Sequence, residues 1–150
     1  MVDLPALLIL IAANSAPVIL SLILGKRYAA AIDGNRLMRD GRPVFGSHKT
    51  WRGVISGTLA AGLIAAFLPT GFILGMVFGA LALAGDLGSS FFKRRLGRGS
   101  GQSFPLVDQL PEALLPMFVL HGTMGLDATE IIGTALAFTV LDVLTARIRA

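Results

Sequence analysis

Long apolar segments alternate with polar ones along this chain. Five apolar segments can be distinguished: Leu4 to Leu24, Val54 to Leu68, Phe72 to Ala84, Pro111 to about Met124, and Ala128 to about Ala146. The first, of about 21 residues, is long enough to cross a hydrocarbon core of roughly 30 Å as a helix. The second and third also reach across if their helices extend to about Lys49 and about Lys93. The pattern therefore predicts an all-α, polytopic integral membrane protein with five transmembrane helices, in a single domain over residues 1–150.

The composition supports a membrane protein. Hydrophobic residues make up 54% of the chain and charged residues 15%, whereas a soluble domain has about a quarter of its residues charged. The absence of cysteine excludes a disulfide framework and cysteine-based metal or nucleophile chemistry. The net charge of +4 comes from basic residues that flank apolar segments, so we expect lipid headgroups and phosphorylated substrates as partners, and no nucleic acid.

The basic residues also predict an orientation. All thirteen lysines and arginines lie in residues 25–52, residues 86–110 or the C-terminal tail. Five crossings place these three regions on one side of the membrane, and cytoplasmic loops are the ones rich in lysine and arginine. We therefore expect a multi-pass protein of the cytoplasmic membrane, with its N-terminus outside and two cytoplasmic loops. The first segment starts at Asp3 and ends at Lys26-Arg27, which favours a retained span over a cleaved signal peptide.

The segment from Gly85 to Gly97 contains the densest group of candidate metal- and phosphate-binding side chains. If a helix continues through it, Asp86, Ser90 and Lys93 share one face, because 3.6 residues complete a turn. That face offers a metal-binding carboxylate, a hydroxyl and a phosphate-binding cation at the membrane boundary. The alternative is an ordinary span that ends in cationic anchors.

The two polar loops contain further groups that suit a nucleotide. Six cations could neutralise phosphates: Lys49, Arg52, Lys93, Arg94, Arg95 and Arg98. Magnesium typically binds one or two carboxylates together with substrate phosphates and waters, and Asp86 and Asp108 could supply these carboxylates. The sequence contains no zinc-ligand spacing, no Walker A loop and no Ser-His-Asp set.

Three features inside the apolar segments are less specific. Asn14, followed by Ser15 and Pro17, fits either a simple kink or the lining of a polar cavity; we favour the cavity, because an amide that faces lipid is costly. Asp142 is expected to pair with a nearby arginine rather than to take part in catalysis. Glycines in the second and third segments favour close packing of that helical hairpin.

Three motifs in order resemble one known family. They are Lys49-Thr50-Trp51-Arg52-Gly53, then Gly85-Asp86-x-x-x-Ser90-Phe91-x-Lys93-Arg94-Arg95-x-Gly97, then Asp108-Gln109. Together they resemble the CDP-archaeol synthase family, which is related to the phosphatidate cytidylyltransferases. The resemblance covers roughly residues 25 to 120, and the combination is more specific than any single motif.

The resemblance implies a CTP-dependent transferase that makes a CDP-lipid from a membrane lipid phosphate monoester, similar to archaetidic or phosphatidic acid, and releases diphosphate. It implies Mg²⁺ as cofactor and CTP as co-substrate. The residues it implies for catalysis are Asp86, Asp108 and Lys93, and those for the nucleotide are Lys49, Thr50, Arg52, Ser90, Lys93, Arg94 and Arg95. The family often has a second aspartate three residues after Asp108, where this chain has Pro111 followed by Glu112. Either Glu112 replaces it as a third metal ligand with Asp86 and Asp108, or the site has fewer protein ligands.

Two other functions remain open at this point. A CTP-dependent polyprenol or lipid kinase would use similar groups but leave a phosphate rather than a CMP unit on the lipid. A small transporter could use the carboxylates as ion ligands, although no inverted repeat supports it. The lipid tails, the ether or ester linkage, the number of metal ions and the presence of homo-oligomers are also open.

Overall fold

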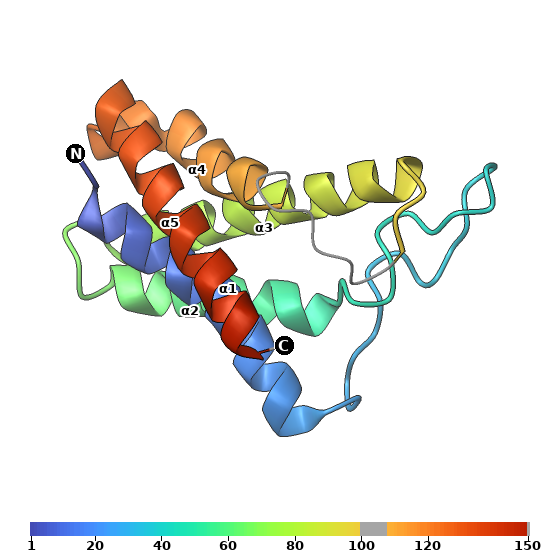
Figure 1. The fold of residues 1–150 in the computed structure, drawn as a ribbon. Helices are drawn as coiled ribbons and strands as arrows, with labels where there is room; N and C mark the ends of the chain where they lie inside the picture. The colour runs from blue at the N-terminus through green and yellow to red at the C-terminus, as the bar shows by residue number, and fades with distance from the viewer. Residues whose placement is uncertain (100–107, 150) are drawn as a thin grey trace.

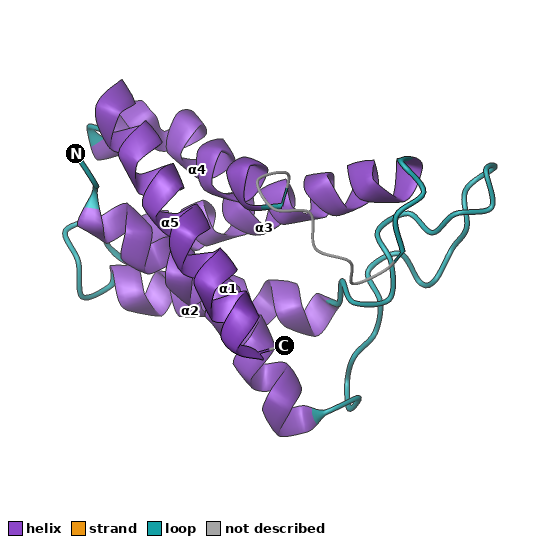
Figure 2. Ribbon diagram, in the orientation of Figure 1, coloured by secondary structure: helices purple, strands orange, loops and turns teal. Residues whose placement is uncertain are grey.

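A computed structural model of the chain describes residues 1–99 and 108–149, with side chains up to residue 145. Five α-helices occupy most of it: α1 (Leu4–Leu24), α2 (Trp51–Ala65), α3 (Phe72–Arg95), α4 (Gln109–Met124) and α5 (Ala128–Arg149). Helices and loops account for the described residues, apart from two isolated β-bridges in the segment between α1 and α2 (Figure 2). The expected all-α architecture is confirmed.

Three of the helices are long and apolar enough to cross a membrane: Leu4–Leu24, Phe72–Arg95 and the Ala128–Thr145 part of α5. Helix α2 is apolar but has only 15 residues, and α4 has 16. The chain is thus a multi-pass helical membrane protein, while the count of five spans stays a prediction. Helix α3 continues to Arg95, so the motif from Asp86 to Lys93 is helical as expected.

Small residues set the distance between α2 and α3. A side chain at Gly75 would collide with the Cβ atom of Ala65, and one at Gly79 with that of Ala61. The same holds between α3 and α4, where a Cβ atom at Gly85 would lie only 2.9 Å from the Cα atom of Glu112. Close helix approach of this kind is typical of membrane bundles. It confirms the expected packing of the hairpin and brings Asp86 next to the start of α4.

All five helices contribute to the core of the bundle. Its largest fully buried side chains include Phe78, Phe138, Ile9 and Met117. Many apolar side chains on the outer helix faces are exposed, as for Phe118 at 72% and Ile73 at 71%. Exposed apolar side chains on a helix bundle suit contact with lipid rather than water.

Residues 25–50 form a folded loop that extends beyond the C-terminal end of α3 (Figure 1). Asp33 organises the loop by accepting hydrogen bonds from the backbone N–H groups of Phe45 and Gly46, both at 2.9 Å. Partial burial opposes ionisation of Asp33, but the backbone hydrogen bonds from Gly46, Phe45 and Asn35 outweigh it and lower its pKa.

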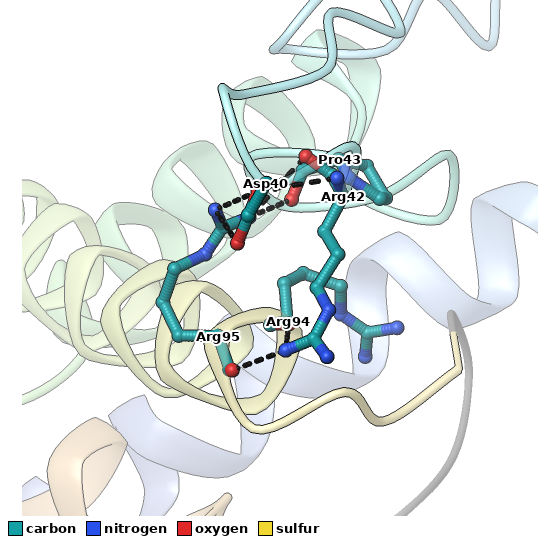
Figure 3. Close-up of polar contacts among 5 residues, drawn as sticks. All are labelled: Asp40, Arg42, Pro43, Arg94 and Arg95. Atoms are coloured by element: carbon teal, nitrogen blue, oxygen red, sulfur yellow. Dashed lines mark hydrogen bonds and ion pairs between the residues drawn. The ribbon is translucent and has the colours of Figure 1, made fainter.

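Arginine side chains attach this loop to α3 (Figure 3). Both Asp40 carboxylate oxygens accept from Arg95 Nη1 at 2.7 Å, and the Pro43 carbonyl accepts from Arg95 Nη2 at 2.6 Å. In return, Arg42 donates to the Arg95 carbonyl at 2.5 Å. A last-turn carbonyl of a helix has no partner within its helix, and here the loop supplies one. The loop thereby covers the end of α3 and faces the site described next.

Candidate active site

A polar cavity of about 580 Å³ lies between the helices and the loop that precedes α2. Pockets for small ligands usually measure about 300–1,000 Å³. Nine of the residues predicted from the sequence line it: Lys49, Thr50, Arg52, Asp86, Ser90, Lys93, Arg94, Asp108 and Glu112. The fold therefore brings the three sequence motifs to one place.

The first ion pair in the cavity joins the loop to α3. Lys49 Nζ lies 2.5 Å from Asp86 Oδ2, and both side chains are about a quarter exposed. The next residue, Thr50, caps α2: its hydroxyl accepts from the Gly53 N–H at 3.1 Å. This cap explains why Lys49 ends the loop and Trp51 begins the helix, since an N-cap hydroxyl satisfies a backbone donor that has no partner in the helix.

The second ion pair joins α3 to α4. Lys93 Nζ lies 2.6 Å from Asp108 Oδ1, and the two side chains are 9% and 17% exposed. Asp108 occupies the N-cap position of α4, but its side chain makes no capping hydrogen bond. The carboxylate therefore faces Lys93 and the cavity rather than the end of its own helix.

Buried polar groups surround these pairs on α3. Ser90 is 2% exposed and Arg94 3%. Arg94 Nη1 donates to the Arg98 carbonyl at 2.7 Å, while its buried Nε has no hydrogen-bond partner within residues 1–99 and 108–149. A buried guanidinium donor without a partner is costly. An anionic ligand in the cavity could supply the missing acceptor.

Two arginines that the sequence predicts to bind the nucleotide, Arg52 and Arg95, contact the loop between α1 and α2 in the structure. Arg52 lines the cavity, but its Nη1 donates to the backbone carbonyls of Gly25 and Arg27. Arg95 does not line the cavity; it binds Asp40 and the loop, while Arg94 extends to another side (Figure 3). The structure thus supplies a scaffolding contact for each, and their role with a nucleotide stays a prediction.

Glu112 is the most buried carboxyl group in the site, at 5% exposure. It lies beside Asn14, yet neither Glu112 Oε1 nor Asn14 Nδ2 has a partner of hydrogen-bond geometry in the described part of the chain. Asn14 lines the cavity from α1, which confirms the expectation that it faces a polar space rather than lipid.

The carboxyl groups that line the cavity fit a magnesium ion that is bound together with substrate phosphates. Among the described residues, no three acidic or histidine side chains are grouped as a complete metal site. Asp86 and Asp108 line one cavity together, and Glu112 leaves a buried oxygen without a partner. Magnesium usually takes one or two carboxylates and completes its shell with phosphates and waters. The donor set fits a metal that arrives with phosphates, rather than one held in an all-protein cage.

Other polar residues line the cavity and were not predicted as site residues, among them His48, Gln109 and Asp142. Gln109 Nε2 donates to Asp142 Oδ2 at 2.9 Å. The side chains of the arginines that follow Asp142 lie outside the described ones, so the expected pairing with an arginine stays a prediction. Gln109 follows Asp108 directly in the third motif, and this position was the available signal. Nothing in the sequence alone linked it to α5.

Comparison with known proteins agrees with this geometry. The family model described as "CarS-like: CDP-archaeol synthase" matches residues 4–150. The CDP-archaeol synthase of Hyperthermus butylicus is 37% identical over 135 residues, which cover 81% of this chain and 77% of that protein. The CDP-archaeol synthase of Thermococcus onnurineus is 36% identical over 131 residues, which cover 80% and 74%.

A solved structure also matches. It is described as "Structural insight into an intramembrane enzyme for archaeal membrane lipids biosynthesis", with a TM-score of 0.78 and 30% identity, over 96% of this chain and 91% of that one. The helical bundle and its cavity of cations and carboxylates thus define an enzyme embedded in the membrane. The chain belongs to the CDP-archaeol synthase family, and it is a CTP-dependent cytidylyltransferase. This confirms the resemblance and sets the transporter alternative aside.

Proposed function

We propose that this protein transfers the cytidylyl group of CTP to the phosphate of an archaeol-type membrane lipid. A phosphate oxygen of the lipid attacks the α-phosphorus of CTP. The bond between that phosphorus and the oxygen that bridges to the β-phosphate breaks, and diphosphate leaves with the bonding electrons. The product is a CDP-lipid. The name of the relatives, CDP-archaeol synthase, supports the lipid class.

The observation that carries the proposal is the charge pattern of the polar cavity. Lys49, Lys93 and Arg94 line it together with Asp86 and Asp108. A lipid phosphate is already a nucleophile, so the chemical barrier lies in bringing two anions together and in stabilising charge on the α-phosphate and the diphosphate. Fixed cations in a partly buried cavity do this better than water, because they need no reorganisation during the reaction.

The two ion pairs suggest how the cavity accepts its substrates. Lys49 and Lys93 each face a carboxylate at 2.5–2.6 Å. We propose that the triphosphate enters with Mg²⁺, that Asp86, Asp108 and Glu112 face the metal, and that the two lysines turn to phosphate oxygens. Bound Mg²⁺ would supply positive charge to the phosphates. The exchange keeps each carboxylate and each lysine neutralised, which favours the joint entry of metal and nucleotide.

Orientation and partners follow from the same reasoning. We propose that the polar cavity opens to the cytoplasm, because loop 25–50 and the end of α3 carry most of the basic residues. The partners are then CTP from the cytoplasm and a lipid phosphate from the bilayer. A site at the membrane boundary suits a substrate with an ionic headgroup and apolar tails.

Product analysis tests the proposal. The purified protein is incubated with CTP labelled in the cytosine ring and a panel of ether- and ester-linked lipid phosphates, and lipids are analysed by mass spectrometry. We expect a lipid with an added CMP unit and one equivalent of diphosphate. A lipid that gains phosphate alone would indicate a kinase, and the absence of any labelled lipid with every substrate would contradict the proposal. The Asp86→Asn variant serves as the inactive control.

A further inference from the structure

A second, mostly apolar cavity of about 210 Å³ lies between α1 and α5. Helix α1 contributes Ile11, Asn14, Ser15 and Val18, which are spaced i, i+3, i+4 and i+7. Helix α5 contributes four residues with the same spacing, from Phe138 to Thr145. Residues with this spacing form one stripe on a helix. Two matching stripes therefore face each other across the cavity.

This cavity adjoins the polar one. Asn14, Val18 and Asp142 line both. Apolar side chains, among them Leu141, dominate the lining on the far side of these three residues. A ligand that occupies both spaces would place an ionic group beside Lys49 and Lys93 and an apolar group between α1 and α5.

Asn14 stands at this junction with an unused donor. Its Nδ2 atom is buried and has no hydrogen-bond partner among the described residues. A buried donor without an acceptor costs free energy, so such a group calls for an acceptor in the working state. Glu112 lies beside Asn14, with a buried Oε1 atom that also lacks a partner of hydrogen-bond geometry among the described residues, and Asp142 on the opposite wall accepts from Gln109 at 2.9 Å. In the proposed function Glu112 faces the metal, so in the working state an acceptor for Asn14 Nδ2 is expected to arrive with a ligand.

We propose that the cavity between α1 and α5 holds one hydrocarbon chain of the lipid phosphate substrate, and that Asn14 Nδ2 donates to an oxygen of its headgroup. The inference rests on the proposed function and specifies where the lipid binds. A lipid phosphate matches the cavities in order: the phosphate faces the cations, a headgroup oxygen faces Asn14, and the chain lies between the two stripes. Oxygens of a lipid headgroup near the phosphate act as hydrogen-bond acceptors, which Asn14 requires.

The first experiment fills the cavity. In Ser15→Phe the new ring occupies space between α1 and α5, whereas in Val140→Phe the same ring is added to an exposed position on the opposite face of α5. We expect Ser15→Phe to lower kcat/KM about tenfold or more for a long-chain lipid phosphate, but to change it little for a short-chain analogue. Val140→Phe should leave both values near wild type. Equal losses with both lipids, or none, would overturn the inference.

The second experiment removes the donor. Asn14→Leu should raise the KM for the lipid about tenfold, as expected for one lost hydrogen bond, and raise the KM for CTP much less. An unchanged lipid KM, or an equal rise for CTP, would contradict the role of Asn14. Melting temperatures in detergent establish that the variants are folded.

A third measurement does not depend on activity. A lipid phosphate with a diazirine in its chain is cross-linked to the wild-type protein, and the labelled peptides are mapped. Labels on Ser15 and Leu141 that a non-photoreactive lipid phosphate displaces would support the inference. Labels on the exposed faces of α2 and α3, or labels that a lipid without phosphate displaces equally, would overturn it. If the wild type makes no CDP-lipid, the proposed function itself fails; if it makes product and the variants behave alike, only this inference fails.

Discussion

The ion pair between Lys93 and Asp108 allows a prediction that separates stability from activity. Asp108→Asn keeps the shape of the side chain but removes the negative charge 2.6 Å from Lys93 Nζ. Removing one partner of a fully buried pair costs about 3–5 kcal/mol, because the other charge stays buried. These side chains are 9% and 17% exposed, so we expect a loss of about 2–3 kcal/mol in the free energy of unfolding. Asp86→Asn breaks a pair with exposures of 26% and 23% and should cost about 1 kcal/mol.

The assay measures thermal unfolding in detergent and CDP-lipid formation on the same preparations. A loss of 2–3 kcal/mol corresponds to a melting temperature lower by roughly 5–10 °C for a chain of this size. The double variant Lys93→Met, Asp108→Asn removes both charges, so it should recover most of this loss. It should nevertheless stay inactive, and excess Mg²⁺ should restore little, because the proposed phosphate-binding cation and the proposed metal-binding carboxylate are both gone.

Two results would refute this reasoning. If Asp108→Asn melts like the wild type, the pair does not contribute to stability as its burial indicates. If the double variant regains CDP-lipid formation, Asp108 and Lys93 serve the fold alone, and the assignment of both to the reaction is wrong. Activity within threefold of wild type in Asp108→Asn would lead to the same conclusion.

Three further predictions test the orientation and the site. Single cysteines at Asn35 and Thr70 should react with an impermeant maleimide from opposite sides, Asn35 from the cytoplasm only; labelling of both from one side would contradict the orientation. Lys49→Ala should raise the KM for CTP about ten- to a hundredfold through loss of a phosphate contact, whereas Arg39→Ala, on an exposed part of the same loop, should change it little. Equal effects would indicate general surface potential. Glu112→Gln should raise the Mg²⁺ concentration for half-maximal activity about tenfold; an unchanged requirement would show that Glu112 is not a ligand.

The sequence by itself determined the local structure. Apolar segments of helical length predicted the five helices, and the period of 3.6 residues placed Asp86, Ser90 and Lys93 on one face of α3. All three line the same cavity. Thr50 ends the loop because its hydroxyl caps α2, which is again a local effect. The order of the three motifs indicated the family before any contact between them was known.

The tertiary structure alone decided which charges meet. The pair of Lys49 and Asp86 spans 37 positions, and the bond between Gln109 and Asp142 spans 33. Such contacts depend on the rotation and spacing of neighbouring helices, which small residues such as Gly85 determine by permitting close approach. The same packing turns Arg95 toward the loop. Hydrophobic periodicity specifies which face of a helix points inward, but not how deeply the helix sits in the bundle or which helix it packs against. The second cavity, with Asn14 at its edge, could therefore not be predicted from the sequence.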